Sequence, residues 1–265
     1  MISPTPESGY SKVNTGFKIV GGIIKNMKKI FNVKVLMGFI FLTFIASLIY
    51  TAVRIYSAPA NAPGFGITVR IKGDYVKLFL QCIVGILAML LPRLLTRKHG
   101  LNIPSALIVI YVLFLYGSIY LGGVRDFYDK VPHWDTMLHL SSGAALSVVG
   151  FSIAGLLHQS KSDQFPLNPL FAAIFAFCFA ITLGVIWEIY EFTMDCFLDG
   201  NLQRYALKGG EPFVGQAALM DTMIDLIADA IGAFVVSAVG YFSLKHKKGC
   251  VERLLIKRSS CGSRV

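Results

Sequence analysis

The sequence predicts an all-α fold, a polytopic membrane protein with a bundle of six transmembrane helices, and three observations carry this prediction. Hydrophobic residues make up 55% of the 265 residues, whereas charged residues make up only 15%. An ordinary soluble domain has about 25% charged residues. The mean hydropathy is +0.63, and several stretches approach the roughly 20 apolar residues that a helix needs to cross a bilayer. These values exclude a disordered tail, a disulfide-stapled mini-protein and a water-soluble enzyme.

The predicted spans follow one another through a membrane domain at 35–245, between a basic segment at 1–34 and a basic tail at 246–265. The first three spans contain hardly any charge, as the interior of a bilayer requires. The last three carry acidic residues, and a proline precedes each of them, where a helix cannot easily continue backwards. The spans run near Val35–Val53, Val76–Leu91, Ile103–Leu121, Met137–Leu157, Leu167–Tyr190 and Asp221–Leu244.

The positions of Lys and Arg predict that both termini are cytoplasmic, because cytoplasmic loops carry an excess of cations. In this N-in/C-in orientation, 17 of the 25 cations lie inside and 8 outside. The formal net charge of +10 in so apolar a chain indicates that the basic termini contact anionic lipids of the inner leaflet. The lipid bilayer is therefore the expected partner, and no nucleic acid is expected. The composition leaves the oligomeric state open.

The segment Phe17–Phe31 precedes the first span and has apolar residues at helical spacing, with lysines elsewhere on the helical wheel. This pattern is typical of a basic helix that lies on the inner leaflet. A short positively charged leader into the first span is the alternative interpretation. No cleavable signal peptide is expected, because the first apolar run begins late and continues for a full span.

The acidic residues are concentrated in the second half of the chain. Twelve of the fifteen lie between Asp126 and Asp229, and only four cations share that stretch. Its net charge is therefore −8, whereas the rest of the chain carries +18. The positive net charge of the whole chain therefore includes a region with a negative net charge.

Eight polar residues in the last three spans form three stripes. Within each stripe they are three or four positions apart, so they share one face of a helix. Because the fourth and sixth spans start outside and the fifth ends outside, we expect the stripes to converge near the extracytoplasmic half of the membrane. The stripes are Asp135 and His139, then Glu188, Glu191 and Asp195, then Asp221, Asp225 and Asp229.

Some of these residues also have a structural interpretation. Asp135 and Asp221 stand at predicted helix starts, where an Asp caps free N–H groups and suits the helix dipole. His139 alone is compatible with a hydrogen-bonded helix histidine. Capping cannot explain acids near the end of the fifth span, nor Asp225 and Asp229 within the sixth. An Asp at a span centre costs about 2.5–3.5 kcal/mol on insertion scales, so these acids need a compensating partner.

The spans themselves offer no such partner, because 131–160, 162–203 and 209–244 contain no Lys or Arg. Loop cations such as Arg204 are candidates. Otherwise the cluster holds protons or a divalent metal ion. Oxygen ligands with one imidazole suit Mg²⁺, Mn²⁺, Ca²⁺ or Zn²⁺. The candidate metal ligands are Asp135, His139, Glu188, Glu191, Asp221 and Asp225.

Three functions remain open from the residues alone. The first is a non-enzymatic membrane protein whose acidic pocket binds or conducts a cation or proton. The second is a metal-dependent membrane enzyme that acts on a lipid or cell-wall precursor, because carboxylates and a bridging metal serve phosphate chemistry. The third is a structural or assembly protein in which a buried polar network fixes helix register. The sequence assigns no catalytic residue.

The fourth and sixth spans also resemble each other, since Asp-Thr-Met begins at Asp135 and again at Asp221, and Gly-Ala pairs follow. Parallel repeats around a central site occur in transporters, but short apolar segments also match by chance. The small residues at Gly143–Ala144–Ala145 and Gly232–Ala233 would let the two helices approach closely.

The same residues resemble a known family. The combined pattern is similar to the YjdF-like bacterial membrane proteins and, more distantly, to the VanZ-like proteins. This resemblance implies a polytopic protein of the bacterial plasma (inner) membrane without an agreed activity. The pattern consists of Asp135, His139 and Gly143, then Glu188 and Glu191, then Gln216, Asp221, Asp225 and Gly232–Ala233.

Overall fold

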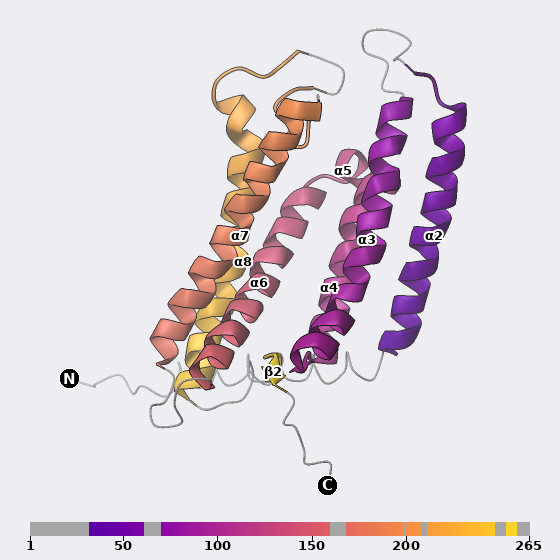
Figure 1. The fold of residues 1–265 in the computed structure, drawn as a ribbon. Coiled ribbons are helices and arrows are strands. Elements are labelled where there is room, and N and C mark those ends of the chain that lie inside the picture. The colour runs from indigo at the N-terminus through magenta and orange to yellow at the C-terminus, as the bar shows by residue number, and fades with distance from the viewer. Residues whose placement is uncertain are drawn as a thin grey trace, which may run out of the picture.

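The structure, a computed structural model, describes residues 32–60, 70–159, 168–198, 200–207, 211–246 and 253–258. Within these residues it contains six helical segments long and apolar enough to cross a membrane (Figure 1). The predicted all-α bundle of six spanning helices is thereby confirmed. The expected helix at Phe17–Phe31 lies outside the described residues. The six segments are α2 (Val33–Ser57), α3 (Lys72–His99), α4 with η1 (Ser105–Leu115 and Tyr116–Val124), α6 (Trp134–Gln159), α7 (Pro169–Leu198) and α8 (Gln216–Lys245).

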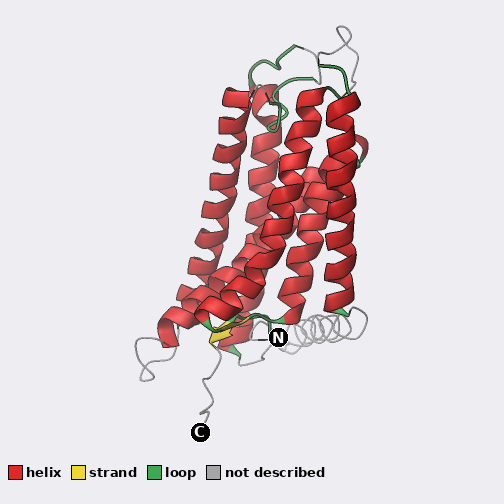
Figure 2. Ribbon diagram, turned by 45° about the vertical axis from the view of Figure 1, so that its right-hand side comes forward, coloured by secondary structure: helices red, strands yellow, loops and turns green. Residues whose placement is uncertain are grey.

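The helices form two sets that run alongside each other (Figures 1 and 2). In the first set α2 packs along α3, and α4 with η1 packs against both. In the second set α6, α7 and α8 pack against one another, and these are the most extensive contacts in the described residues. The helices α4 and α6, together with η1, link the sets. The acid-bearing helices therefore form one compact unit.

The two ends of the bundle carry different elements. At one end α3 stops at Gly100, whose φ of 60° is left-handed, and the short strand β1 (Leu101–Asn102) follows. This strand pairs antiparallel with β2 (Lys257–Arg258) of the basic tail. The other end holds the short helix α5 (Phe127–Lys130) and the described residues 200–207 and 211–215, which precede α8. The acidic ends of α6, α7 and α8 lie at this second end.

The helices of the acidic unit are longer than the apolar runs that predicted them. The helix α6 begins at Trp134, α7 continues to Leu198, and α8 begins at Gln216. A polar side chain ends an apolar run, but it does not end a helix whose backbone groups remain paired along the axis. The capping role expected for Asp221 is therefore wrong, because Asp221 lies five residues inside α8, whose N-cap is Gly215.

Glycines let α6 and α8 approach so closely that no side chain fits between their backbones. A Cβ atom on Gly143 would stand 2.3 Å from the Asp229 carbonyl oxygen, and one on Gly232 would stand 2.1 Å from the Leu140 carbonyl oxygen. Farther along, the buried hydroxyls of Ser147 and Ser237 share a hydrogen bond of 2.9 Å. The small residues thus make the close contact that the sequence predicted.

The third span ends in a π-helix, and side chains from elsewhere in the chain hydrogen-bond to its carbonyl groups near both of its ends. Arg70 donates to the carbonyl oxygens of Gly123 (2.5 Å) and Val124 (3.4 Å), and it also pairs with Asp126. The indole N–H of Trp134 donates to the Gly117 carbonyl oxygen at 3.2 Å. Because Trp134 begins α6, the π-helix fixes the start of the helix that carries Asp135 and His139.

The helix contact predicts opposite effects for one substitution at two positions of α6. We expect Gly143→Ala to lower the free energy of unfolding by about 1–3 kcal/mol, because the new methyl group meets backbone. A methyl group added at Gly155 would meet no atom within 4 Å, so Gly155→Ala should be neutral or stabilising by up to about 1 kcal/mol through helix propensity. Thermal unfolding of both variants in detergent tests the contact. Equal stabilities of the two variants would contradict it.

Candidate functional site

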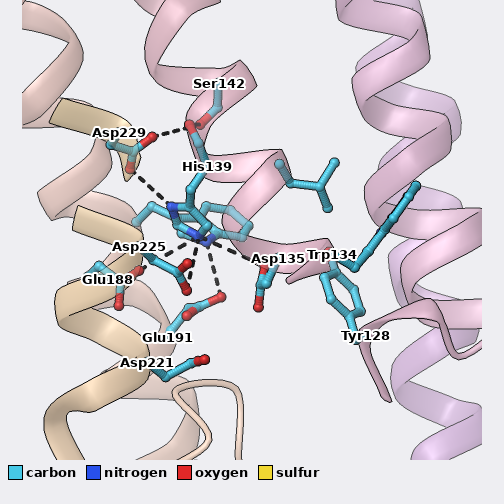
Figure 3. A network of polar contacts seen from close by, with 12 residues as sticks. Tyr128, Trp134, Asp135, His139, Ser142, Glu188, Glu191, Asp221, Asp225 and Asp229 are labelled. Carbon is cyan, nitrogen blue, oxygen red and sulfur yellow. Dashed lines mark hydrogen bonds and ion pairs between the residues drawn. The ribbon is translucent and has the colours of Figure 1, made fainter. Parts of the chain in front are cut away.

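The imidazole of His139 is the centre of a polar cluster between α6, α7 and α8 (Figure 3). Its Nδ1 atom lies 3.0 Å from a carboxylate oxygen of Asp229, which is hydrogen-bond distance. Its Nε2 atom lies at longer and nearly equal distances from three further carboxylates. These distances are 3.9 Å to Asp135 Oδ1, 3.8 Å to Glu188 Oε1 and 3.9 Å to Asp225 Oδ2.

Helical spacing and two small residues build this arrangement. Asp135 and His139 are one turn apart on α6, as are Asp225 and Asp229 on α8. Gly184 makes room for Asp229, since a Cβ atom at Gly184 would stand 2.5 Å from Asp229 Oδ2. The second oxygen of Asp229 accepts a hydrogen bond of 2.9 Å from Ser142. Both carboxylate oxygens of Asp229 therefore have a hydrogen-bond partner on α6.

Two carboxylates of the cluster are buried without hydrogen-bond donors. Glu188 is 5% exposed and Asp225 is 1% exposed. In the part of the chain that the structure describes, no donor reaches either oxygen of Glu188 or the Oδ1 atom of Asp225. Burying a charged group without compensation costs several kcal/mol. These atoms therefore call for a partner.

Arg204 supplies the only guanidinium that reaches the cluster among the described residues. Its Nη2 atom lies 3.4 Å from Asp135 Oδ2, and its Nη1 atom lies 3.5 Å from Asp221 Oδ1. It also donates to the Tyr128 carbonyl oxygen at 3.0 Å. The side chain is 34% exposed, so it stands at the outer rim. Arg204 is one of the loop cations that the sequence offered as partners.

The other two acids of the α7 stripe have separate roles. Glu191 is buried and accepts a hydrogen bond of 3.1 Å from the Trp187 indole. Asp195 accepts from the backbone N–H groups of Leu202 and Gln203, at 2.7 and 2.9 Å. Neither acid is within ion-pair distance of His139 in the described part of the chain. Asp195 shapes the loop that carries Arg204 rather than facing the imidazole.

Residues that the sequence did not single out complete the site. Ser142 is three residues after His139 and Gly184 is four residues before Glu188, so helical spacing from known site residues would have found both. Tyr128 gives no such signal, because it lies in α5. Burial raises the pKa of Tyr128, and the nearby negative charges of Asp135 and Glu191 raise it further. Its phenol therefore remains protonated beside the acids.

A subset of the cluster has the geometry to share one metal ion. Asp135, His139 and Asp225 each offer a ligand atom, and these three atoms lie within 4.8 Å of one another. Glu188 approaches the same Nε2 atom of His139. Asp221, which also figured among the candidate ligands, faces Arg204 instead. The arrangement can hold a cation between imidazole and carboxylates.

The pairing of Arg204 predicts a compensated double variant. Arg204→Gln should lower the free energy of unfolding by about 1–2 kcal/mol, because two partly buried carboxylates lose a charged donor. Adding Asp221→Asn should recover part of this loss, since one unpaired charge is removed. Arg125→Gln, which changes an exposed arginine of the same end, is the control and should leave stability unchanged. Additive losses in the double variant would contradict the pairing.

Comparisons with known proteins place the chain in a family. A family model described as a predicted membrane protein (DUF2238) matches residues 33–246. An uncharacterized protein of Thermotoga maritima is 31% identical over 134 residues, which cover 49% of this chain and 60% of that relative. No solved structure matches. Since the family model spans the whole six-helix domain, the chain belongs to the DUF2238 family of membrane proteins.

Proposed function

We propose that this multi-pass membrane protein binds a cation in the cluster around His139. The observation that carries the proposal is the burial of Glu188 and Asp225 with oxygens that no described donor reaches. Both carboxylates approach the same imidazole nitrogen. A cation between them would supply the missing interaction. Neither a helix cap nor a packing contact would do so.

The charge of the cluster supports the same conclusion. Apart from Asp195, which binds the backbone of its own loop, six carboxyl groups lie on the three helices around His139, and one guanidinium, that of Arg204, pairs with two of them. If all are ionised and His139 is neutral, five negative charges remain to be neutralised within the bundle. Charges of one sign at this density are not stable in an apolar environment unless protons or cations neutralise them. The carboxyl groups are Asp135, Glu188, Glu191, Asp221, Asp225 and Asp229.

The exposure of the acids supports access from one side only. Asp135 and Asp221 have 13% and 19% of their side chains exposed, whereas Asp225 and Asp229 have 2% each. Beyond Asp229 the backbones of α6 and α8 touch through Gly143, and this contact leaves no room for water. These features favour binding of a cation over its conduction.

We further propose that the protein lies in a bacterial plasma membrane, as its resemblance to the YjdF-like proteins implies, and that the site faces the extracytoplasmic side. The excess of cations in the segments at the opposite end of the helix bundle supports this orientation. There the described tail residues Lys257 and Arg258 pair with the strand after α3. In this orientation the basic termini are placed to contact anionic lipids.

Cation binding predicts a stabilisation that depends on Glu188. Detergent-purified protein is treated with chelator, and its thermal unfolding is followed with Na⁺, Mg²⁺, Ca²⁺, Mn²⁺ or Zn²⁺. We expect at least one cation to raise the melting temperature of the wild type, because a ligand that binds only the folded state stabilises it. Glu188→Gln should abolish this rise while the variant still folds.

The matched control is Glu211→Gln, which removes an exposed carboxylate near the same end of the bundle. This variant should retain the full response to the cation. If no cation shifts the wild type, or if Glu188→Gln responds as the wild type does, the proposed cation site is wrong.

A further inference from the structure

We propose that the cation is a single divalent transition-metal ion, held directly by His139. In this arrangement Asp135, Glu188 and Asp225 supply oxygen ligands, and Asp229 acts as a positioning residue for the imidazole. The inference rests on the proposed function and adds the chemical class of the ion and the role of each residue.

The hydrogen bond to Asp229 determines which imidazole nitrogen is free. The Nδ1 atom of His139 lies 3.0 Å from Asp229 Oδ2. A carboxylate only accepts hydrogen bonds, so in the proposed arrangement Nδ1 donates its proton to Asp229. The Nε2 atom of a neutral ring then presents a lone pair. A histidine that binds a metal commonly donates its other ring N–H to a carboxylate in this way.

The surroundings of Nε2 fit a bound ion better than a hydrogen bond. Three carboxylate oxygens, from Asp135, Glu188 and Asp225, lie 3.8–3.9 Å from it, which is beyond hydrogen-bond distance. Two ligands at about 2.0–2.2 Å from one tetrahedral ion are roughly 3.3–3.6 Å apart. The ligand atoms of Asp135, His139 and Asp225 lie within 4.8 Å of one another, so these side chains, and Glu188 with them, would move inward around the ion. A lone pair that faces three carboxylates is repelled unless a metal ion or a proton lies between them, and the metal ion is the alternative that we propose.

The ligand types select the class of metal. Mg²⁺ and Ca²⁺ take oxygen ligands almost exclusively, and a nitrogen lone pair contributes little to their binding. Imidazole with carboxylates suits the first-row divalent ions from Mn²⁺ to Zn²⁺. Up to three carboxylate charges also match a divalent ion better than a monovalent one. We therefore assign the site to this series rather than to an alkali or alkaline-earth ion.

The residues that contact the proposed ligands from outside the metal position also support this assignment. Asp135 directs Oδ1 toward His139 and Oδ2 toward Arg204, so one carboxylate joins the metal position to the guanidinium at the rim. Asp229 is held in turn by the Ser142 hydroxyl. Such second contacts orient the ligands of a metal site. No donor among the described residues lies within hydrogen-bond distance of Glu188, so its carboxylate is able to turn toward the ion.

Titration with Co²⁺ tests the inference, because its visible absorption reports coordination. Chelator-treated full-length protein in detergent should bind one Co²⁺ per chain with intense visible bands, and Zn²⁺ should displace it. His139→Gln should lose the bands and lower the affinity at least 100-fold. His158→Gln, at the far end of the same helix α6, should bind as the wild type does.

Asp229→Asn separates orientation from ligation. It keeps the shape of the side chain but weakens the hydrogen bond that fixes the imidazole, so binding of Co²⁺ should persist with an affinity 10- to 100-fold lower. An unchanged affinity would overturn the role given to Asp229. Pulsed EPR of the wild type with Mn²⁺ should show one coordinated nitrogen, and this readout does not depend on whether a variant folds.

The outcomes distinguish this inference from the proposed function. If a cation stabilises the wild type through Glu188 but no nitrogen coordinates it, or if His139→Gln binds Co²⁺ as tightly as the wild type, the transition-metal assignment fails and the cation site stands. If no cation binds to the wild type at all, both fail.

Discussion

The approach of α6 to α8 through Gly143 and Gly232 is the constraint on which the rest of the site depends. Their backbones lie too close for side chains between them, so the polar residues one turn before each glycine are brought face to face. His139 precedes Gly143 by four residues, and Asp229 precedes Gly232 by three. The hydrogen bond between His139 and Asp229 follows from this contact. Without the glycines the two stripes would be separated by a layer of side chains.

The third helix of the unit, α7, completes the arrangement from the opposite direction. It runs antiparallel to the other two, so its last turns meet their first turns. Gly184 admits Asp229, Glu188 reaches the imidazole one turn later, and Asp195 shapes the loop that returns Arg204 to the rim. One helix thus supplies the space for Asp229, the carboxylate of Glu188 beside the imidazole, and the residue that holds the loop of Arg204. The first three helices support this unit through the π-helix and Trp134.

The sequence predicted the six helices because a helix needs about 20 mostly apolar residues to cross a bilayer, and such runs are visible in the sequence. It predicted the convergence of the stripes because helical spacing and alternating direction are fixed geometry. It could not predict the helix ends, and Asp221 was therefore given a capping role although α8 begins at Gln216. Nor could the sequence predict which loop cation would form ion pairs with the acids of the cluster. The position of Arg204 depends on a loop whose backbone is held by Asp195. Distances within the cluster follow from helix packing, which no local pattern encodes.

If the site faces the outside of the membrane as proposed, the position of His139 near the start of α6 has an electrical consequence. It lies one turn beyond Asp135 on α6, or about 6 Å along the helix axis. With Asp135 at the outer edge of a hydrocarbon core of about 30 Å, an ion entering from outside would cross roughly a fifth of the transmembrane field. A full crossing is worth about 2.3 kcal/mol per charge at 100 mV. Occupancy by a divalent ion would therefore change by only about 1 kcal/mol per 100 mV, so that the ion concentration outside, rather than the membrane voltage, would govern it.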